Sequence, residues 1–144
     1  MNDTRMRILD TDTLSAFHRG RAEVIARYSS VPLALRAITA ITVEEVLRGR
    51  FAQINQAKKP EKLIQAYDFL CDAVYKLSRI RVLRFDEDAA AQYELIKRFR
   101  SRVGTLDLRI AAIVLSHQGV LITVNQNHFQ QIPNLVTEDW TAIV

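Results

Sequence analysis

The sequence has little of the residues that mark unusual classes of protein. It contains one cysteine, four glycines and three prolines among 144 residues. The single cysteine, Cys71, cannot form an internal disulfide, which fits a protein of the reducing cytoplasm. Hydrophobic residues make up 49% and charged residues 25% of the chain, as in an ordinary globular protein. We therefore expect a single domain over residues 1–144 with its own hydrophobic core.

Long hydrophobic segments are also missing. The longest apolar stretch, residues 110–124, is interrupted by the polar segment 116–119 and is too short and too broken to cross a membrane. Near the N-terminus, Asp10 and Asp12 come before any apolar segment long enough for a secretory signal. We expect a cytoplasmic protein that does not associate with membranes.

Basic residues outnumber acidic residues 20 to 16, and 15 of the 20 are arginines. A guanidinium group binds phosphate through two parallel hydrogen bonds and stacks on bases, as a lysine ammonium does not. Two clusters stand out, at Arg79, Arg81 and Arg84 and at Arg98, Arg100 and Arg102. They are candidates for a phosphate-binding track, with an ordinary solvated surface as the equally good alternative.

Strands and helices are predicted to alternate along the chain. Strands are expected over residues 5–10, 33–41, 80–85, 120–124 and 135–137. Helices are expected over residues 11–20, 21–30, 42–58, 60–77, 87–102 and 105–119. This order predicts an α/β fold, a three-layer α/β/α sandwich with a central parallel sheet.

Local signals set several helix boundaries. Thr42 and Glu45 form a T-x-x-E capping box, Asp86 is a cap for the helix that follows it, and Gly104 and Gly119 are predicted stops. The helix over residues 60–77 carries an apolar stripe at helical spacing, so it should pack antiparallel to the helix over 42–58.

Carboxylates and one amide fall where the predicted strands end. Asp10 and Asp12 lie at the carboxyl end of the first strand, Glu45 comes shortly after the second, and Asn125 follows the strand at 120–124. Asp107 opens the buried helix. The carboxyl ends of parallel strands lie at one edge of the sheet, so these side chains can converge. Such a cluster is self-repelling without a counter-charge, and Mg²⁺ with its oxygen ligands supplies one. A bound ion can activate water for phosphodiester hydrolysis.

Each residue also has an ordinary structural explanation. Asp10 and Asp12 are good N-caps, Glu45 completes the capping box, and Asp107 suits the positive end of a helix. What favours the metal site is that all of these groups fall at the same edge of one sheet. A zinc site is not predicted, because no metal-ligand spacing connects Cys71 with the three histidines, His18, His117 and His128.

An ordered set of short motifs resembles a known family. The segments are ILDTDTLS at 8–15, T-x-x-E-x-x-x-G at 42–49, FDEDAA at 85–90, GTLDLRIAA at 104–112 and LITVNQNHF at 121–129. In this order, over nearly the whole chain, they look like the successive signatures of PIN-domain toxins of the VapC type.

The resemblance implies a metal-dependent endoribonuclease with Mg²⁺, or alternatively Mn²⁺, as cofactor. It matches Asp10, Glu45 and Asp107 to the acidic metal-site residues and Asn125 to the fourth position, which is often Asp in PIN domains. Asp12 stands where relatives carry Asn or Asp and is a candidate assisting group. The resemblance also implies an RNA substrate, a small antitoxin partner that plugs the active-site groove, and a homodimer.

Two rival interpretations remain open at this stage. The segment ILDTDTL also looks like the D-x-D-x-T motif of haloacid-dehalogenase-type phosphohydrolases, with Asp10 as nucleophile and Asp12 as acid/base. That family has a late acidic pair where this chain has Asn125 and Asn127. The other rival is a non-catalytic PIN module that binds RNA or protein, against which the presence of Asp10, Glu45 and Asp107 together argues.

Overall fold

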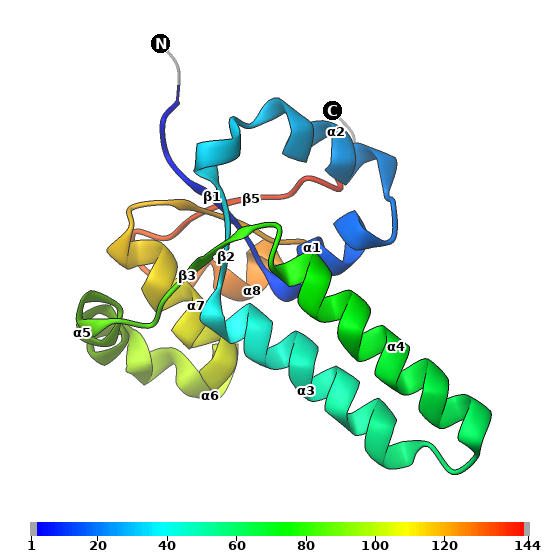
Figure 1. The fold of residues 1–144 in the computed structure, drawn as a ribbon. Coiled ribbons are helices and arrows are strands. Elements are labelled where there is room, and N and C mark those ends of the chain that lie inside the picture. Colours follow the sequence, from blue (N-terminus) through cyan, green and yellow to red (C-terminus); the bar gives the residue numbers. More distant parts are fainter. Residues whose placement is uncertain (1–2, 143–144) are drawn as a thin grey trace.

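The computed structural model of the protein describes residues 3–142 and has a five-stranded sheet at its centre (Figure 1). The strands are β1 (Arg7–Leu9), β2 (Arg36–Thr39), β3 (Arg81–Leu83), β4 (Val120–Ile122) and β5 (Val136–Glu138). All neighbouring strands are parallel, and their spatial order is β3-β2-β1-β4-β5. The predicted parallel sheet is therefore confirmed.

Eight α-helices and two short 3-10 helices lie among the described residues. The α-helices are α1 (Thr11–His18), α2 (Ala22–Ser30), α3 (Ala40–Gln56), α4 (Pro60–Leu77), α5 (Glu87–Ile96), α6 (Arg100–Val103), α7 (Thr105–Ser116) and α8 (Gln126–Phe129). The 3-10 helices are η1 (Leu33–Leu35) and η2 (Lys97–Phe99). The predicted helix over 87–102 is thus divided into three consecutive pieces.

The sheet has an apolar core on each face, because successive strand residues point to opposite sides. Ile8 and Leu121 face a core that α5 and α7 complete. Leu9 and Ile122 face the other core, which holds Leu14 of α1 and Val24 of α2. Since both faces are covered by helices, the molecule is the predicted α/β/α sandwich.

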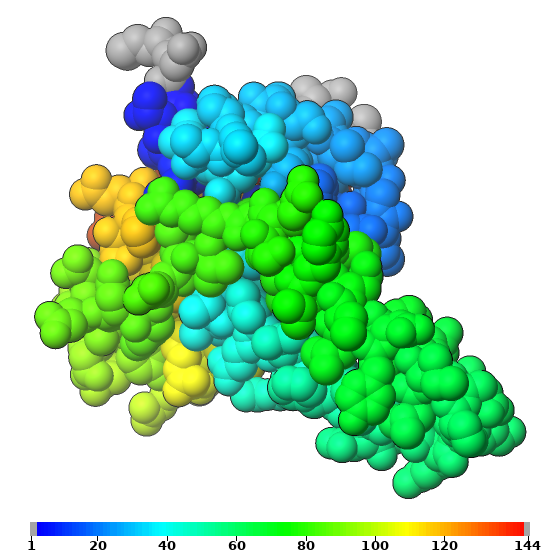
Figure 2. Space-filling model, viewed as in Figure 1, coloured from blue at the N-terminus to red at the C-terminus, as the bar shows by residue number. Residues whose placement is uncertain are grey.

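Helices α3 and α4 form a long antiparallel pair that extends away from the sheet (Figure 1). In the space-filling view this pair forms a separate lobe that tapers away from the rest of the molecule (Figure 2). Within α4 only Ala66, Ala73 and Leu77 are buried. The antiparallel pairing is confirmed, but much of the apolar stripe on α4 remains exposed.

The predicted capping box at Thr42 is wrong. The cap of α3 is Thr39, whose hydroxyl accepts a hydrogen bond from the backbone N–H of Thr42 at 3.2 Å. Thr42 itself lies buried inside the first turn of the helix. The side chain of Glu45 is consequently not needed to cap α3 and is available for another contact.

Gly119 has a different role from the helix stop that was predicted. Helix α7 ends at Ser116, and the left-handed backbone conformation beyond it belongs to Gln118, with φ of 52°. A Cβ atom at Gly119 would lie 2.8 Å from Ile8 Cδ1 and 3.1 Å from the carbonyl oxygen of Met6. The glycine therefore lets the chain enter β4 in close contact with β1.

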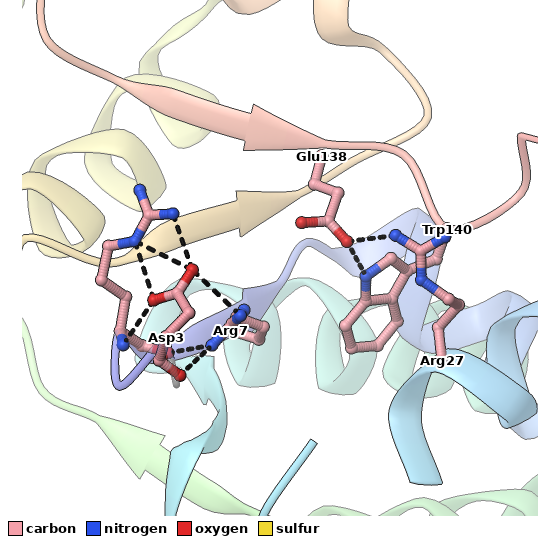
Figure 3. Close-up of polar contacts among 6 residues, drawn as sticks. Asp3, Arg7, Arg27, Glu138 and Trp140 are labelled. Atoms are coloured by element: carbon pink, nitrogen blue, oxygen red, sulfur yellow. Dashed lines mark hydrogen bonds and ion pairs between the residues drawn. The ribbon is translucent and has the colours of Figure 1, made fainter. Parts of the chain in front are cut away.

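The C-terminal segment after β5 is fixed to the sheet and to α2. Trp140 is 1% exposed, and its indole N–H donates a hydrogen bond to Glu138 Oε1 at 2.8 Å. Arg27 of α2 donates to the same carboxylate oxygen (Figure 3). On the other side of the same view, Asp3 forms an ion pair with Arg7 at the start of β1.

Candidate metal centre

Asp10 directly follows β1 and is almost completely buried, at 6% exposed. Its Oδ1 accepts a hydrogen bond at 2.9 Å from the backbone N–H of Thr13, so it caps α1 as the sequence indicated. Burial raises the pKa of Asp10, and the negative charge of Asp12 acts in the same direction, although hydrogen bonds from Thr123 and Thr13 partly offset the effect. An aspartate that only caps a helix can stay exposed to solvent, so capping alone does not explain the burial of Asp10.

Glu45 lies in the second turn of α3, which begins directly after β2. Its Oε1 accepts a hydrogen bond at 2.7 Å from the hydroxyl of Thr11, the first residue of α1. Burial raises the pKa of Glu45, and so do the negative charges of Asp107, Asp12 and Asp10. Because Thr11 stands between Asp10 and Asp12, its contact brings Glu45 next to the start of α1. The charge of Asp107 on α7 also acts on Glu45.

Asp107 lies in the first turn of α7 and contacts a histidine. Nε2 of His128 lies 2.7 Å from the carbonyl oxygen of Val103 and 3.2 Å from Asp107 Oδ2. A carbonyl oxygen can only accept, so Nε2 carries the proton and donates to both groups. Burial raises the pKa of Asp107, His128 lowers it, and Asp12 raises it.

Asn125 contacts the cluster through Asp12. Its Nδ2 lies 3.4 Å from Asp12 Oδ2, so the segment between β4 and α8 meets α1 at this point. Asp12 itself is exposed, whereas Asp10 is buried. The structure thus brings together Asp10, Glu45 and Asp107, which were singled out for a metal site, and it adds Asn125 through its contact with Asp12.

Sequence reasoning missed Thr11 and His128. Thr11 stands between two aspartates that drew attention, and His128 was considered only as a zinc ligand. Each hydrogen-bonds one oxygen of a site carboxylate, Glu45 Oε1 and Asp107 Oδ2 respectively. The only sequence signal for them is that they lie inside the DTD and NQNHF segments.

The donor set fits a hard divalent cation. The groups offered are carboxylate and amide oxygens. Burial is the main cause that raises the pKa of three of the carboxyl groups, and a bound cation would offset the cost of keeping their charges there. No arginine or lysine of residues 3–142 forms an ion pair with Asp10, Asp12, Glu45 or Asp107. Within the same residues, no three His, Cys, Asp or Glu side chains already converge on one point as metal ligands.

A comparison with known families decides the classification. The PIN domain family matches residues 7–135 of this chain. The chain belongs to the PIN-domain family. This confirms the resemblance drawn from the ordered motifs, and the match covers every element that contributes to the site.

Individual relatives narrow the classification within that family. Ribonuclease VapC1 of Haemophilus influenzae strain R2866 is 31% identical over 140 residues, covering 93% of this chain and 97% of the relative. The solved structure of VapBC-1 from nontypeable Haemophilus influenzae has a TM-score of 0.74 at 26% identity, covering 95% of this chain and 99% of that chain. A toxin-antitoxin complex from Klebsiella pneumoniae has a TM-score of 0.64 at 25% identity, covering 91% and 96%. Among PIN domains, this chain groups with the VapC ribonucleases.

Proposed function

We propose that the protein is a divalent-metal-dependent endoribonuclease, the toxin of a toxin–antitoxin pair, that hydrolyses RNA phosphodiester bonds. The observation that carries the proposal is the group of four carboxylates, none of them paired with an arginine or lysine of residues 3–142, in a chain of the PIN family. A relative named as a ribonuclease supports RNA as the substrate. The phosphohydrolase alternative with Asp10 and Asp12 is disfavoured, because the chain matches the PIN family over residues 7–135.

Asp10, Glu45 and Asp107 would hold the cation, with Asn125 at the edge of the site. When bound, a divalent ion such as Mg²⁺ supplies an activated water and neutralises charge on the leaving oxygen. The protein's own contribution is to fix the ligands. Thr11 holds one oxygen of Glu45, His128 holds one oxygen of Asp107, and the backbone of α1 holds one oxygen of Asp10. Because these three carboxylates are already oriented, their side chains need little rearrangement when the metal ion and the substrate bind.

Two of the ligands keep a free oxygen for the metal. Among residues 3–142, Glu45 Oε2 and Asp107 Oδ1 accept no hydrogen bond from the protein, whereas their other oxygens do. A carboxylate that is fixed through one oxygen can offer the second to a cation in a defined direction. Without a cation the negative charges of these side chains would repel one another: after burial, the charge of Asp107 is one of the causes that raise the pKa of Glu45.

The partner surface that we propose is the exposed side of α4. Ile64, Tyr67, Val74 and Tyr75 on this helix are between 51% and 65% exposed. A soluble protein rarely leaves so many large apolar side chains on one helix without a partner. The related Klebsiella structure is a toxin-antitoxin complex. We assign this surface to the antitoxin, and we expect the protein itself to be a cytoplasmic homodimer.

None of the helices in the described part of the chain is long and apolar enough to span a membrane.

Two experiments test the proposed function. Purified protein should cleave structured RNA in Mg²⁺, and EDTA should abolish the cleavage, because the carboxylates alone cannot activate water at neutral pH. Cleavage that persists in EDTA would contradict the metal-dependent mechanism.

Expression of the protein alone should arrest bacterial growth, and co-expression of a partner that covers α4 should restore it. Normal growth at verified expression would contradict the toxin role while leaving the nuclease chemistry intact.

A further inference from the structure

Three neighbouring strands of the sheet begin with arginine. Arg7 opens β1, Arg36 opens β2 and Arg81 opens β3. Since the strands are parallel, these residues lie at the amino edge of the sheet, opposite the edge that carries Asp10. Arg81 belongs to the cluster of Arg79, Arg81 and Arg84 in the sequence. The proposed catalytic centre gives this cluster no role.

A surface pocket lies beside two of these strand starts. It has a volume of about 400 Å³, and its lining includes Tyr28, Leu33, Arg36, Arg79 and Arg81. We call it the basic pocket. Leu33 is 71% exposed and adds an apolar wall. No aspartate or glutamate is among the lining residues.

The charges of the basic pocket are not neutralised by the protein. Within residues 3–142, no carboxylate forms an ion pair with Arg36, Arg79 or Arg81. Three positive groups of one pocket are thus left for an external anion. Arginine is the side chain that matches phosphate most closely, because its fork donates two parallel hydrogen bonds.

Arg36 and Arg79 are also held in place. Arg36 donates from Nε to the carbonyl oxygen of Val31 at 2.8 Å and from Nη2 to that of Ser29 at 3.3 Å, which leaves Nη1 for a ligand. Its guanidinium lies 4.5 Å from the centre of the Tyr28 ring. Arg79 Nη1 donates to the hydroxyl of Tyr75 at 3.0 Å. These partners are neutral, so they orient the two cations without removing their charge. A preorganised cation loses less side-chain entropy when it binds a phosphate.

The basic pocket adjoins a smaller hollow at the C-terminal end of α1, the helix that begins at the metal centre. This hollow, lined by Phe17, His18 and Lys76 among others, shares Tyr28, Arg79 and Ile80 with the basic pocket. His18 is the last residue of α1, and Asp10 caps its first turn. The helix has 8 residues, or about 12 Å at 1.5 Å per residue. A stacked strand covers this length with about four nucleotides at roughly 3.4 Å each.

We propose that the basic pocket binds the phosphate backbone of the RNA substrate, outside the catalytic groove. This inference rests on the proposed ribonuclease function and adds a second contact region for the same substrate. The expected ligand is a single-stranded RNA segment several nucleotides away from the scissile bond. Phosphate contacts of this kind position a nucleic acid and carry no sequence information. The basic pocket should therefore strengthen binding of long RNA without selecting the cleavage site.

The experiment compares two double variants that lose the same charge. The test variant carries Arg79→Gln and Arg81→Gln, which leave the structural contacts of Arg36 intact. The control carries Lys58→Gln and Lys59→Gln, two exposed cations between α3 and α4 that form no ion pair in the described part of the chain. Binding of fluorescently labelled RNA of about 20 and about four nucleotides is measured by anisotropy in EDTA, so that the result does not depend on cleavage.

For the long RNA, the test variant should raise Kd roughly tenfold and reduce the slope of log K against log salt by about 1.4, or 0.7 for each lost contact. The short RNA and the control variant should change little. In Mg²⁺, the KM for long RNA should rise while kcat stays the same.

Equal weakening by both variants, or no weakening by the test variant, would overturn the proposal. If the test variant weakens binding of a poly-glutamate peptide and not of RNA, the pocket belongs to an acidic protein segment instead. A parent protein that binds long RNA through the pocket but never cleaves it in Mg²⁺ would contradict the proposed function alone.

Discussion

The two edges of the central sheet carry opposite charges. At the carboxyl edge, Asp10 caps the first helix, and the pKa of Asp10, Glu45 and Asp107 is raised by burial. At the amino edge, Arg36 and Arg81 begin two strands and form no ion pair in the described part of the chain. A parallel sheet separates strand starts from strand ends, so a short chain can hold uncompensated charge of both signs. We assign the acidic edge to a metal ion and the basic edge to phosphate.

The largest expected effect comes from removing a carboxylate of the acidic edge. Asp10→Asn should lower the rate of RNA cleavage by more than about 100-fold, beyond the range usual for outer-shell groups. The physical reason is that the amide keeps a cap for α1 but cannot contribute negative charge to a cation. Cleavage rates of parent and variant in saturating Mg²⁺ measure the effect, and Asp86→Asn, which changes the cap of α5, is a matched control. Similar rates for parent and Asp10→Asn would remove Asp10 from the site.

A smaller loss is expected when the support of a carboxylate is removed. Thr11→Val deletes the hydroxyl that donates to Glu45 at 2.7 Å and keeps the shape of the side chain. Activity or metal affinity should fall by about 10- to 100-fold, as is usual for groups that orient a ligand. A Mg²⁺ titration of cleavage separates the two effects, and Thr11→Ser should restore the lost function. If Thr11→Val behaves like the parent protein, Glu45 does not depend on this contact.

The smallest expected effect is the pH dependence of stability without metal. The pKa of Glu45 is raised above its ordinary value of 4.5. Protonation of Glu45 therefore stabilises the folded state. This stabilisation is fully present below about pH 4.5 and is lost as the pH rises through the pKa that Glu45 has in the folded protein. In EDTA, the free energy of unfolding of the parent should fall relative to Glu45→Gln between about pH 4.5 and neutral pH. Urea unfolding at several pH values measures the difference in free energy of unfolding between parent and variant. A difference that stays constant with pH would show that the pKa of Glu45 is not raised in the folded protein.

The sequence predicted the framework of this molecule well where the signal is local. Helix α4 begins at Pro60 and ends at Leu77, as the proline and the apolar spacing indicated. The strand predicted over 33–41 is shorter, because residues 33–35 form a 3-10 helix and α3 begins at Ala40. Strand ends depend on pairing with distant residues, which a single sequence does not reveal.

The candidate site shows the same division between local and distant information. Asp10, Glu45, Asp107 and Asn125 could be selected because each follows a predicted strand or opens a helix, and their role as metal ligands stays a prediction. The contacts of Thr11 with Glu45 and of His128 with Asp107 join residues 34 and 21 positions apart. No helical or strand periodicity links such pairs, so only the folded chain reveals them.

The most direct test of the central claim is a set of four thermal melts, of the parent and of Asp107→Asn, each in EDTA and in Mg²⁺. If crowded carboxylates surround a cation site, the metal-free variant should be as stable as the parent or more stable. Mg²⁺ at a hundredfold excess over its Kd should stabilise the parent by about 2.7 kcal/mol and the variant much less. If Asp107 only complements the dipole of α7, the variant should lose about 0.3–1 kcal/mol in both conditions. That second result, together with undiminished RNA cleavage, would contradict the metal centre described for this protein.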